Sequence, residues 1–191
     1  MEQLRLAAIA TVPWGPPEEP YGACGCFLCF PRGQSGYGDK GDAAWAAAAR
    51  ISPEDGMETS LVRGTAAAPY RAGLLALREG SLLESAVRAL RCPGRVLLVN
   101  ATGRDHPRRA GLALHLGAIL DIPTVGVTHR PLVARGEWPA ASRGASTPLE
   151  IGGKRVGLRL RTSSMGRPLA VHPAWRTDAE TARSVVLTAT Q

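Results

Sequence analysis

The segment from Asn100 to Arg109 concentrates side chains whose chemistry suits a phosphate group. It carries an amide at Asn100, a histidine at His106 and two adjacent guanidinium groups at Arg108 and Arg109. Guanidinium forks and the backbone amides at the start of a helix are groups that proteins use to hold phosphates. We therefore interpret this segment as a phosphate-facing loop. A solvated loop around a structural His-Pro turn is the alternative.

The neighbouring elements would place this loop at the edge of a parallel sheet. Arg95–Val99 and Thr124–Val127 are short, continuous apolar runs, which are typical of strands buried on both faces. Ala110–Leu120 between them is predicted to be helical, and Ser81–Leu90 before them has the spacing of an amphipathic helix. Strand, helix and strand at this spacing form a βαβ unit, and functional residues collect at the carboxyl ends of such strands.

The first quarter of the chain gives weaker signals. Residues 13–42 are rich in Pro and Gly and indicate a loop, within which Cys26–Phe30 could form a short strand. The Ala-rich run Ala43–Ile51 is consistent with a helix or with a hairpin strand before a turn at residues 53–56.

The last part of the chain predicts a hairpin and a closing helix. Gly152-Gly153 is followed by two apolar runs, Val156–Leu160 and Leu169–Val171, which we interpret as the hairpin. The closing helix spans Asp178–Leu187, where Thr177 and Asp178 can cap its first turn.

Composition bounds the class of protein. A chain of 191 residues suits a single domain, and 45% apolar with 20% charged residues is ordinary for a soluble globular protein. The net charge of +7, carried mostly by Arg, favours a polyanionic partner. A GC-rich genome would produce the same Arg bias, so the charge alone does not decide.

Targeting and cysteine signals point to the cytoplasm. We find neither an apolar window long enough for a membrane span nor a secretory leader, and we expect a cytoplasmic monomer with no membrane partner. Cys24, Cys26 and Cys29 are clustered, but a convincing fourth ligand for zinc is missing. Buried or surface thiols are the preferred interpretation.

Three segments together resemble the endonuclease V family. Asn100–Gly117 is similar to the family pattern D-G-x-G-x-x-H-P-R-x-x-G-x-A-x-H-x-G, and Asp121–Val127 resembles its D-x-P-T-I-G-V. Upstream, Pro69–Gly80 is similar to P-Y-x-P-G-x-L-x-F-R-E-G, and the fit runs without gaps from Pro69 to Val127. The resemblance covers about residues 60–190 and the first 50 match poorly. We therefore divide the chain into an N-terminal segment, 1–42, and an endonuclease V-like domain, 43–191.

The resemblance implies an RNase H-like α/β fold, with a mixed sheet flanked by helices in a single domain. Family members cut one strand near deaminated purines, chiefly inosine, in DNA or RNA, and they use Mg²⁺. By resemblance Tyr70, beside Pro69, is the wedge that opens the strand, although Arg71 and Ala72 depart from the usual wedge. The resemblance also implies that Gly73, Leu74 and Leu75 line the base pocket, that Gly103 keeps the loop open for the nucleic-acid backbone and that His106 lies near the scissile phosphate. Gly126 is a further matching position assigned to nucleic-acid contact, and His115 matches a family position too.

The catalytic pattern is where this sequence departs from the family. Of the three family carboxylates only Glu79 is retained, because Asn100 stands at the second Asp and the first Asp falls on Phe27 or Gln34. The family lysine is His129 here. Mg²⁺ prefers anionic oxygen ligands, and each lost carboxylate removes on the order of 4 kcal/mol of attraction. Glu79 and Asn100 are the surviving metal-ligand positions, and we expect them to hold Mg²⁺ poorly.

Three hypotheses follow. The first is an endonuclease V-like protein that recognises inosine sites in DNA or RNA but has lost, or strongly reduced, nuclease activity. The alternative is an active metal-dependent endonuclease that cleaves 3′ to inosine in DNA repair. Its site would be rebuilt from Asp39, Asp42 or Asp105, or from His106 with His129 around Mn²⁺ or Zn²⁺. The third is a partner-binding relic without nucleic-acid affinity.

Overall fold

The computed structural model describes residues 1–17, 21–31, 38–52, 56–91 and 94–191. Gln34, Cys92 and most of the predicted turn at 53–56 lie outside the described residues. In chain order the elements are α1 (Glu2–Ala8), β1 (Ala23–Cys29), β2 (Ala43–Ser52), β3 (Gly56–Thr65), α2 (Leu75–Arg88), β4 (Val96–Val99), α3 (Leu112–Leu120), β5 (Thr124–Thr128), β6 (Ser146–Ile151), β7 (Lys154–Leu160), β8 (Leu169–Pro173) and α4 (Ala179–Thr188). Within the described part of the chain, no helix has both the length and the apolar character needed to cross a membrane.

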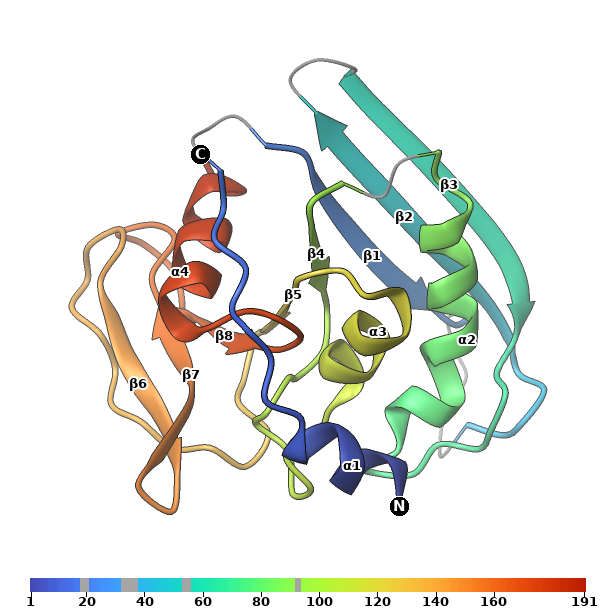
Figure 1. The fold of residues 1–191 in the computed structure, drawn as a ribbon, viewed down its shortest axis with the longest axis horizontal. Helices are drawn as coiled ribbons and strands as arrows, with labels where there is room; N and C mark the ends of the chain where they lie inside the picture. The colour runs from blue at the N-terminus through green and yellow to red at the C-terminus, as the bar shows by residue number, and fades with distance from the viewer. Residues whose placement is uncertain (18–20, 32–37, 53–55, 92–93) are drawn as a thin grey trace.

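The strands form one eight-stranded mixed sheet in the order β3-β2-β1-β4-β5-β8-β7-β6 (Figure 1). The pairs β1–β4 and β4–β5 are parallel, and the other neighbours are antiparallel. The predicted α/β class and the predicted βαβ unit, β4-α3-β5, are therefore confirmed. Because β1 lies between β2 and β4, residues 23–29 belong to the same sheet as the rest of the chain.

Several elements correct or complete the sequence expectations. Ala43–Ser52 is a strand, and every second side chain on most of its length is buried, as expected for an inner strand of a sheet. The helix expected at Ser81–Leu90 begins earlier, at Leu75, without a side-chain cap to mark its start. We did not predict α1, β3 or β6. Of the two proposed caps for α4, Asp178 accepts a hydrogen bond from the Thr181 amide at 2.8 Å. The Thr177 hydroxyl instead donates to the Thr124 carbonyl of β5 and accepts from the backbone amide of Ala174, the residue after β8.

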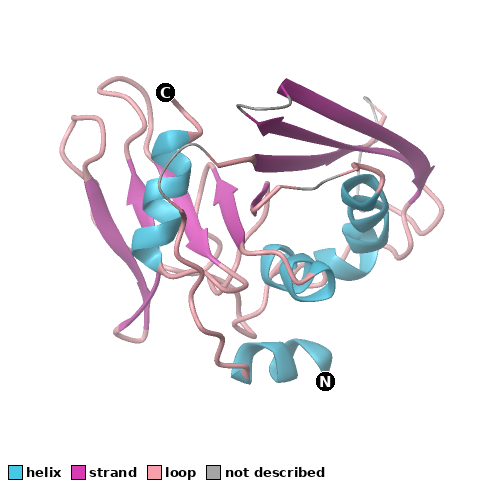
Figure 2. Cartoon of the chain, turned by 45° about the horizontal axis from the view of Figure 1, so that its top comes forward, coloured by secondary structure: helices cyan, strands magenta, loops and turns pink. Residues whose placement is uncertain are grey.

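The helices cover the two faces of the sheet unequally. α2 and α3 pack with α1 over one apolar cluster, which includes Leu97 and Val99 of β4. α4 packs over a second cluster, which includes Val96 of β4 and thus lies on the opposite face. Figure 2 shows α4 beside β7 and β8, away from β1, β2 and β3. The part of that face formed by β2, β1 and β4 is consequently left open.

Gly126 is where β5 comes closest to the loop that follows β4. A Cβ atom built on Gly126 would lie 2.2 Å from the carbonyl oxygen of Ala101 and 3.2 Å from the side chain of Ala113. The backbone at Ala101 and the packed helix α3 cannot both move aside to make room for an added methyl group. Gly103 is constrained in the same way, since its Cβ would lie 2.4 Å from the Pro173 carbonyl oxygen. Close packing therefore accounts for both glycines.

We predict that Gly126→Ala lowers the free energy of unfolding by about 2–4 kcal/mol through this overlap. The matched control is Gly25→Ala on β1, because a Cβ there meets nothing within 4 Å. The control should change stability by less than about 0.5 kcal/mol. Urea unfolding followed by circular dichroism would measure both, and equal values for the two variants would contradict the packing argument.

Candidate nucleic-acid and metal site

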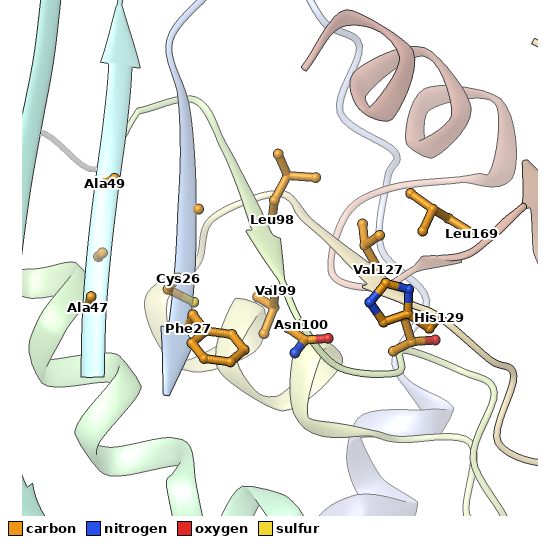
Figure 3. A pocket seen from close by; sticks show the side chains of 13 residues that line it. Cys26, Phe27, Ala47, Ala49, Leu98, Val99, Asn100, Val127, His129 and Leu169 are labelled. Atoms are coloured by element: carbon orange, nitrogen blue, oxygen red, sulfur yellow. The ribbon is translucent and has the colours of Figure 1, made fainter. Parts of the chain in front are cut away.

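A cavity of about 450 Å³ lies on the open part of the sheet, and we call it the sheet-face cavity. Its lining residues come from five strands and their ends: Gly25, Cys26, Phe27, Ala47, Ala48, Ala49, Leu98, Val99, Asn100, Val127, Thr128, His129 and Leu169. Figure 3 shows the Phe27 ring, the Asn100 amide and the His129 imidazole following one another from β1 towards β5. The structure therefore brings together Asn100, His129 and Phe27, which is one of the two alternatives that the sequence offered for the first family Asp.

A second cavity of about 370 Å³ lies among the loops at the carboxyl ends of the strands, and we call it the loop cavity. It is lined by Gln3, Tyr70, Arg71, Gly73, Leu75, Ala76, Asn100, Ala101, Thr102, His106, Gly111, Leu112, Thr128, Arg130, Pro131 and Leu132. Asn100 and Thr128 line both cavities, so these two residues form a shared wall. The cavity combines apolar side chains with several polar groups, a composition common in ligand pockets.

The carbonyl oxygen of Gly73 fixes the shape of the loop cavity. It accepts hydrogen bonds from Gln3 Nε2 at 3.0 Å, from His106 Nε2 at 3.1 Å and from Arg108 Nη1 at 3.5 Å. Gly73 has a φ of 76°, a left-handed conformation that favours glycine. Gln3 on α1 was missed by the sequence reasoning, because no local pattern connects it with a loop 70 residues away.

His106 is held as a neutral imidazole. Its Nδ1 accepts a hydrogen bond from the Arg108 backbone amide at 3.1 Å, so the proton lies on Nε2, which donates to Gly73. Burial also lowers the pKa of His106, with smaller opposing effects from the Gly73 hydrogen bond and Asp105. Both ring nitrogens are thus occupied within the protein. This arrangement makes His106 a group that shapes the loop, with no free nitrogen for a metal ion.

The predicted wedge and its arginines lie around the mouth of the loop cavity. Tyr70 is 42% exposed, and its backbone amide donates to the Gly38 carbonyl at 2.8 Å. Arg71 lines the cavity, and Arg108 donates a hydrogen bond to the carbonyl oxygen of Gly73, another lining residue. Arg109 instead donates to the Ile151 carbonyl at 3.2 Å. Pro69 and Leu74 do not line the loop cavity and instead border a shallower apolar hollow beside it.

Glu79 lies on the side of α2 that faces the core, one turn before the buried Leu83. Burial raises its pKa to about 7, although the neighbouring Arg78 acts in the opposite direction. The Arg78 guanidinium is itself engaged, because it pairs with Asp42 at 2.8 Å and stacks on Phe30 at 4.3 Å. Glu79 lines neither cavity.

Two of the three carboxylates that could have rebuilt the site, Asp42 and Asp105, have structural partners. Asp105 is fully buried and accepts three backbone hydrogen bonds, from Leu132 at 2.7 Å, Val133 at 2.9 Å and Ala134 at 2.7 Å. Asp42 forms the ion pair with Arg78. Asp105 therefore anchors the loop over residues 132–134, while Asp42 neutralises a buried guanidinium, and neither points to a metal site.

The donor set around the sheet-face cavity does not fit Mg²⁺. None of the described residues that line it is a carboxylate, and Asn100 supplies only a neutral amide. Across the described residues, no group of three or more His, Cys, Asp or Glu side chains could hold a metal ion. Mg²⁺ needs near-octahedral oxygen ligands with at least one or two carboxylates. The described residues thus lack what the family resemblance implies for this ion.

We predict that Glu79→Gln stabilises the protein in a pH-dependent way. As pH rises from about 4.5 to 7, the unfolded carboxyl loses its proton before the folded one, so Glu79 costs stability across this window. Above pH 7 the variant should exceed the wild type by on the order of 1–2 kcal/mol, and below pH 4.5 the two should agree. Urea unfolding at pH 4 and pH 8 would measure the difference.

The control is Glu84→Gln on the same helix, whose carboxylate pairs with Arg88 at the surface at 2.8 Å. This variant should not gain stability at pH 8. If Glu79→Gln proved less stable than the wild type at pH 8, the carboxylate would have to be held ionised by a nearby cation, and our description of the site would be wrong.

Comparisons with known proteins agree with the fold. A family model described as Endonuclease V matches residues 34–191. The endonuclease V of Methanopyrus kandleri is 41% identical over 145 residues, which are 75% of this chain and 62% of that protein. That of Streptomyces avermitilis is 38% identical over 146 residues, 75% of this chain and 64% of that protein. The chain therefore spans less than two thirds of the length of these relatives.

Solved structures extend the likeness to nearly the whole chain. The Streptomyces avermitilis endonuclease V superposes with a TM-score of 0.85 at 32% identity, covering 99% of this chain and 80% of that one. The catalytic domain of human endonuclease V gives 0.85 at 28% identity, with 100% and 85% coverage. A Ciona intestinalis endonuclease V, solved in complex with a 24mer DNA containing an inosine followed by a ribo-adenosine, gives 0.76 at 16% identity, with 97% and 85% coverage. These folds are RNase H-like, which confirms the fold class expected from the sequence.

Proposed function

The chain belongs to the endonuclease V family, and from this premise we propose that it recognises deaminated purine (inosine) sites in DNA or RNA with lost or strongly reduced nuclease activity. The observation that carries the proposal is the meeting of Phe27, Asn100 and His129 in one cavity. By resemblance, Asn100 stands at a family carboxylate, Phe27 is one of two alternatives for another, and His129 stands at the family lysine. These side chains supply neither anionic ligands for a cation nor a fixed positive charge for a phosphate.

The geometry of the loop cavity supports the recognition part of the proposal. The loop cavity is formed and is lined by Tyr70, Gly73 and Leu75, three of the positions assigned to the wedge and the base pocket. The Gly73 carbonyl is held by three donors, so the loop is organised before any ligand enters. A preorganised pocket loses less entropy when a flipped base binds. The net charge of +7 would contribute sequence-independent attraction for the backbone.

The alternative function is a metal-dependent endonuclease that cleaves 3′ to inosine in DNA repair. The retained Glu79 favours it, together with family membership. Under this alternative a divalent ion would be held despite the missing carboxylates, and its binding would require Glu79 in the ionised form. The two functions differ in one measurable property, which is whether a divalent ion causes cleavage of the bound strand.

The deciding experiment uses inosine-containing and matched adenosine-containing oligonucleotides, single-stranded and duplex, as DNA and as RNA. We expect inosine-selective binding that is the same in EDTA, Mg²⁺ and Mn²⁺, with no nicking, and an affinity that falls as salt rises because phosphate contacts release counterions. Divalent-dependent nicking that disappears in Glu79→Ala would establish the alternative. Absence of binding to every oligonucleotide would favour the partner-binding relic.

Restoring the carboxylates provides a positive control for the site. The double variant Phe27→Asp/Asn100→Asp places two carboxylates next to each other across the paired strands β1 and β4. We predict that Mg²⁺ at millimolar concentration raises the melting temperature of this variant but leaves that of the wild type unchanged, because only the variant offers paired anionic ligands. The isosteric Asn100→Asp single variant is the control and should respond weakly. A wild-type shift as large as that of the double variant would contradict the proposal.

Tyr70 supplies a separate test of base capture. Its side chain is partly exposed at the loop cavity, so Tyr70→Ala should leave stability nearly unchanged. Loss of the ring should weaken inosine binding about tenfold and reduce the preference over adenosine. Met57→Ala on the edge strand β3 is the control, since Met57 is 71% exposed and lies apart from both cavities. Equal affinities for Tyr70→Ala and Met57→Ala would exclude Tyr70 as the wedge.

A cytoplasmic location is the compartment that the thiols favour. Cys24, Cys26 and Cys29 are free in the structure, and burial raises the pKa of Cys24 and Cys26 to about 12. Free, unreactive thiols of this kind fit a reducing environment.

A further inference from the structure

Phe27 is an exposed aromatic ring in the middle of a sheet. Its side chain is 52% exposed, although β1 has paired strands on both sides. The chain has only two phenylalanines, and the other, Phe30, is covered by the Arg78 guanidinium. A large apolar side chain at the centre of a sheet is normally covered by a helix, and its exposure beside a cavity indicates a binding surface.

The surroundings of Phe27 leave space over the ring. Its partner on β2 is Ala47, and the next lining residue along β2 on the same face is Ala49. On β1 the adjacent residue of that face is Gly25, where an added Cβ meets nothing within 4 Å. Small side chains on two strands thus form the floor of a hollow with one flat ring in it. A planar, apolar ligand is the shape that such a hollow accepts.

Polar groups lie on one side of this hollow only. Asn100 and His129 border it, and Asn100 is exposed at the end of β4 (Figure 3). An amide can donate to and accept from the edge of a nucleobase, while an aromatic ring stacks on its face. Apart from Thr128, Cys26 and the Phe27 ring, the rest of the lining consists of glycine and aliphatic residues. One stacking face and one hydrogen-bonding edge match a nucleobase better than an apolar helix of another protein, which would leave the amide unpaired.

The sheet-face cavity lies next to the loop cavity, because Asn100 and Thr128 line both. If the loop cavity holds a flipped purine, the next nucleotide of the same strand must pass this shared wall. We propose that the sheet-face cavity binds the base of a nucleotide adjacent to the flipped purine, stacked on Phe27 with its edge at Asn100. This inference rests on the proposed function and adds a second base site to it. Phe27 would then determine affinity for the flanking nucleotide.

The test measures the contribution of the flanking base. Single-stranded inosine oligonucleotides are compared with the same strands carrying an abasic site immediately 5′ or immediately 3′ of the inosine, and with adenosine in place of inosine. The proteins are the wild type, Phe27→Ala, Phe27→Tyr, Gly25→Leu and the surface control Leu61→Ala, which removes a side chain that is 71% exposed on β3. Affinity is measured in EDTA, and far-ultraviolet circular dichroism verifies that each variant is folded.

We expect an abasic site on one side of the inosine to weaken wild-type binding about tenfold. Phe27→Ala should weaken binding of the intact strand by a similar factor and should no longer distinguish intact from abasic strands. Phe27→Tyr should retain the discrimination, because the ring remains. Gly25→Leu, which fills the open space beside the ring, should behave like Phe27→Ala. Leu61→Ala should match the wild type.

The inosine-to-adenosine ratio reports the proposed function separately. A wild type that prefers inosine but binds abasic and intact strands equally would overturn the second base site alone. A wild type that distinguishes abasic from intact strands without preferring inosine would retain the second base site and overturn inosine recognition. Phe27→Ala that keeps the abasic discrimination would exclude stacking on Phe27, and failure to bind any strand would overturn both.

Discussion

The parallel pairing of β1, β4 and β5 is the constraint on which the candidate site depends. The register places Cys26 beside Val99 and Val99 beside Gly126, so the residues that follow on β1 and β4 are neighbours as well. Phe27 and Asn100 therefore meet although 73 positions separate them in the chain. A slip of one residue in either pairing would turn each side chain to the other face of the sheet. The tight contact of Gly126 with Ala101 resists such a slip.

Removing carboxylates from a metal site changes the state of the carboxylate that remains. In a site with a bound cation, a buried glutamate is ionised because the cation offsets the cost of burial. For Glu79, burial raises the pKa to about 7, and the neighbouring Arg78 offsets only part of this effect. At Asn100, and at Phe27 if it stands at the first family Asp, a neutral side chain takes the place of an anionic ligand. The described residues that line the sheet-face cavity include no carboxylate.

Much of this architecture could be predicted from the sequence, and the elements that could not be predicted lack a local sequence pattern. The buried strands β4 and β5 and the helix between them follow from continuous apolar runs, and the substitutions at Asn100 and His129 follow from motif positions. β3 was missed because it lies at the edge of the sheet, where many of its residues are exposed and the apolar pattern is weak. Gln3, the structural role of Asp105 and the cavities were missed because long-range contacts define them, and such contacts leave no local signature. Asp105 in particular was a plausible ligand by type, yet three backbone amides occupy it.

Two features of the fold lie outside the segment that matches the family model. One is the hydrogen bond from Gln3 to Gly73, and the other is the central strand β1. Similarity to the family model begins at residue 34, after both features. A fragment cut at that boundary would lose a middle strand of the sheet, leave β2 and β4 with unpaired edges, and release one of the three donors that hold the Gly73 carbonyl. Sequence similarity thus delimits the part of the chain whose residues are shared with relatives, while the autonomous folding unit is larger. Expression of the matched segment by itself would yield an incomplete sheet whose unpaired strand edges are prone to aggregation.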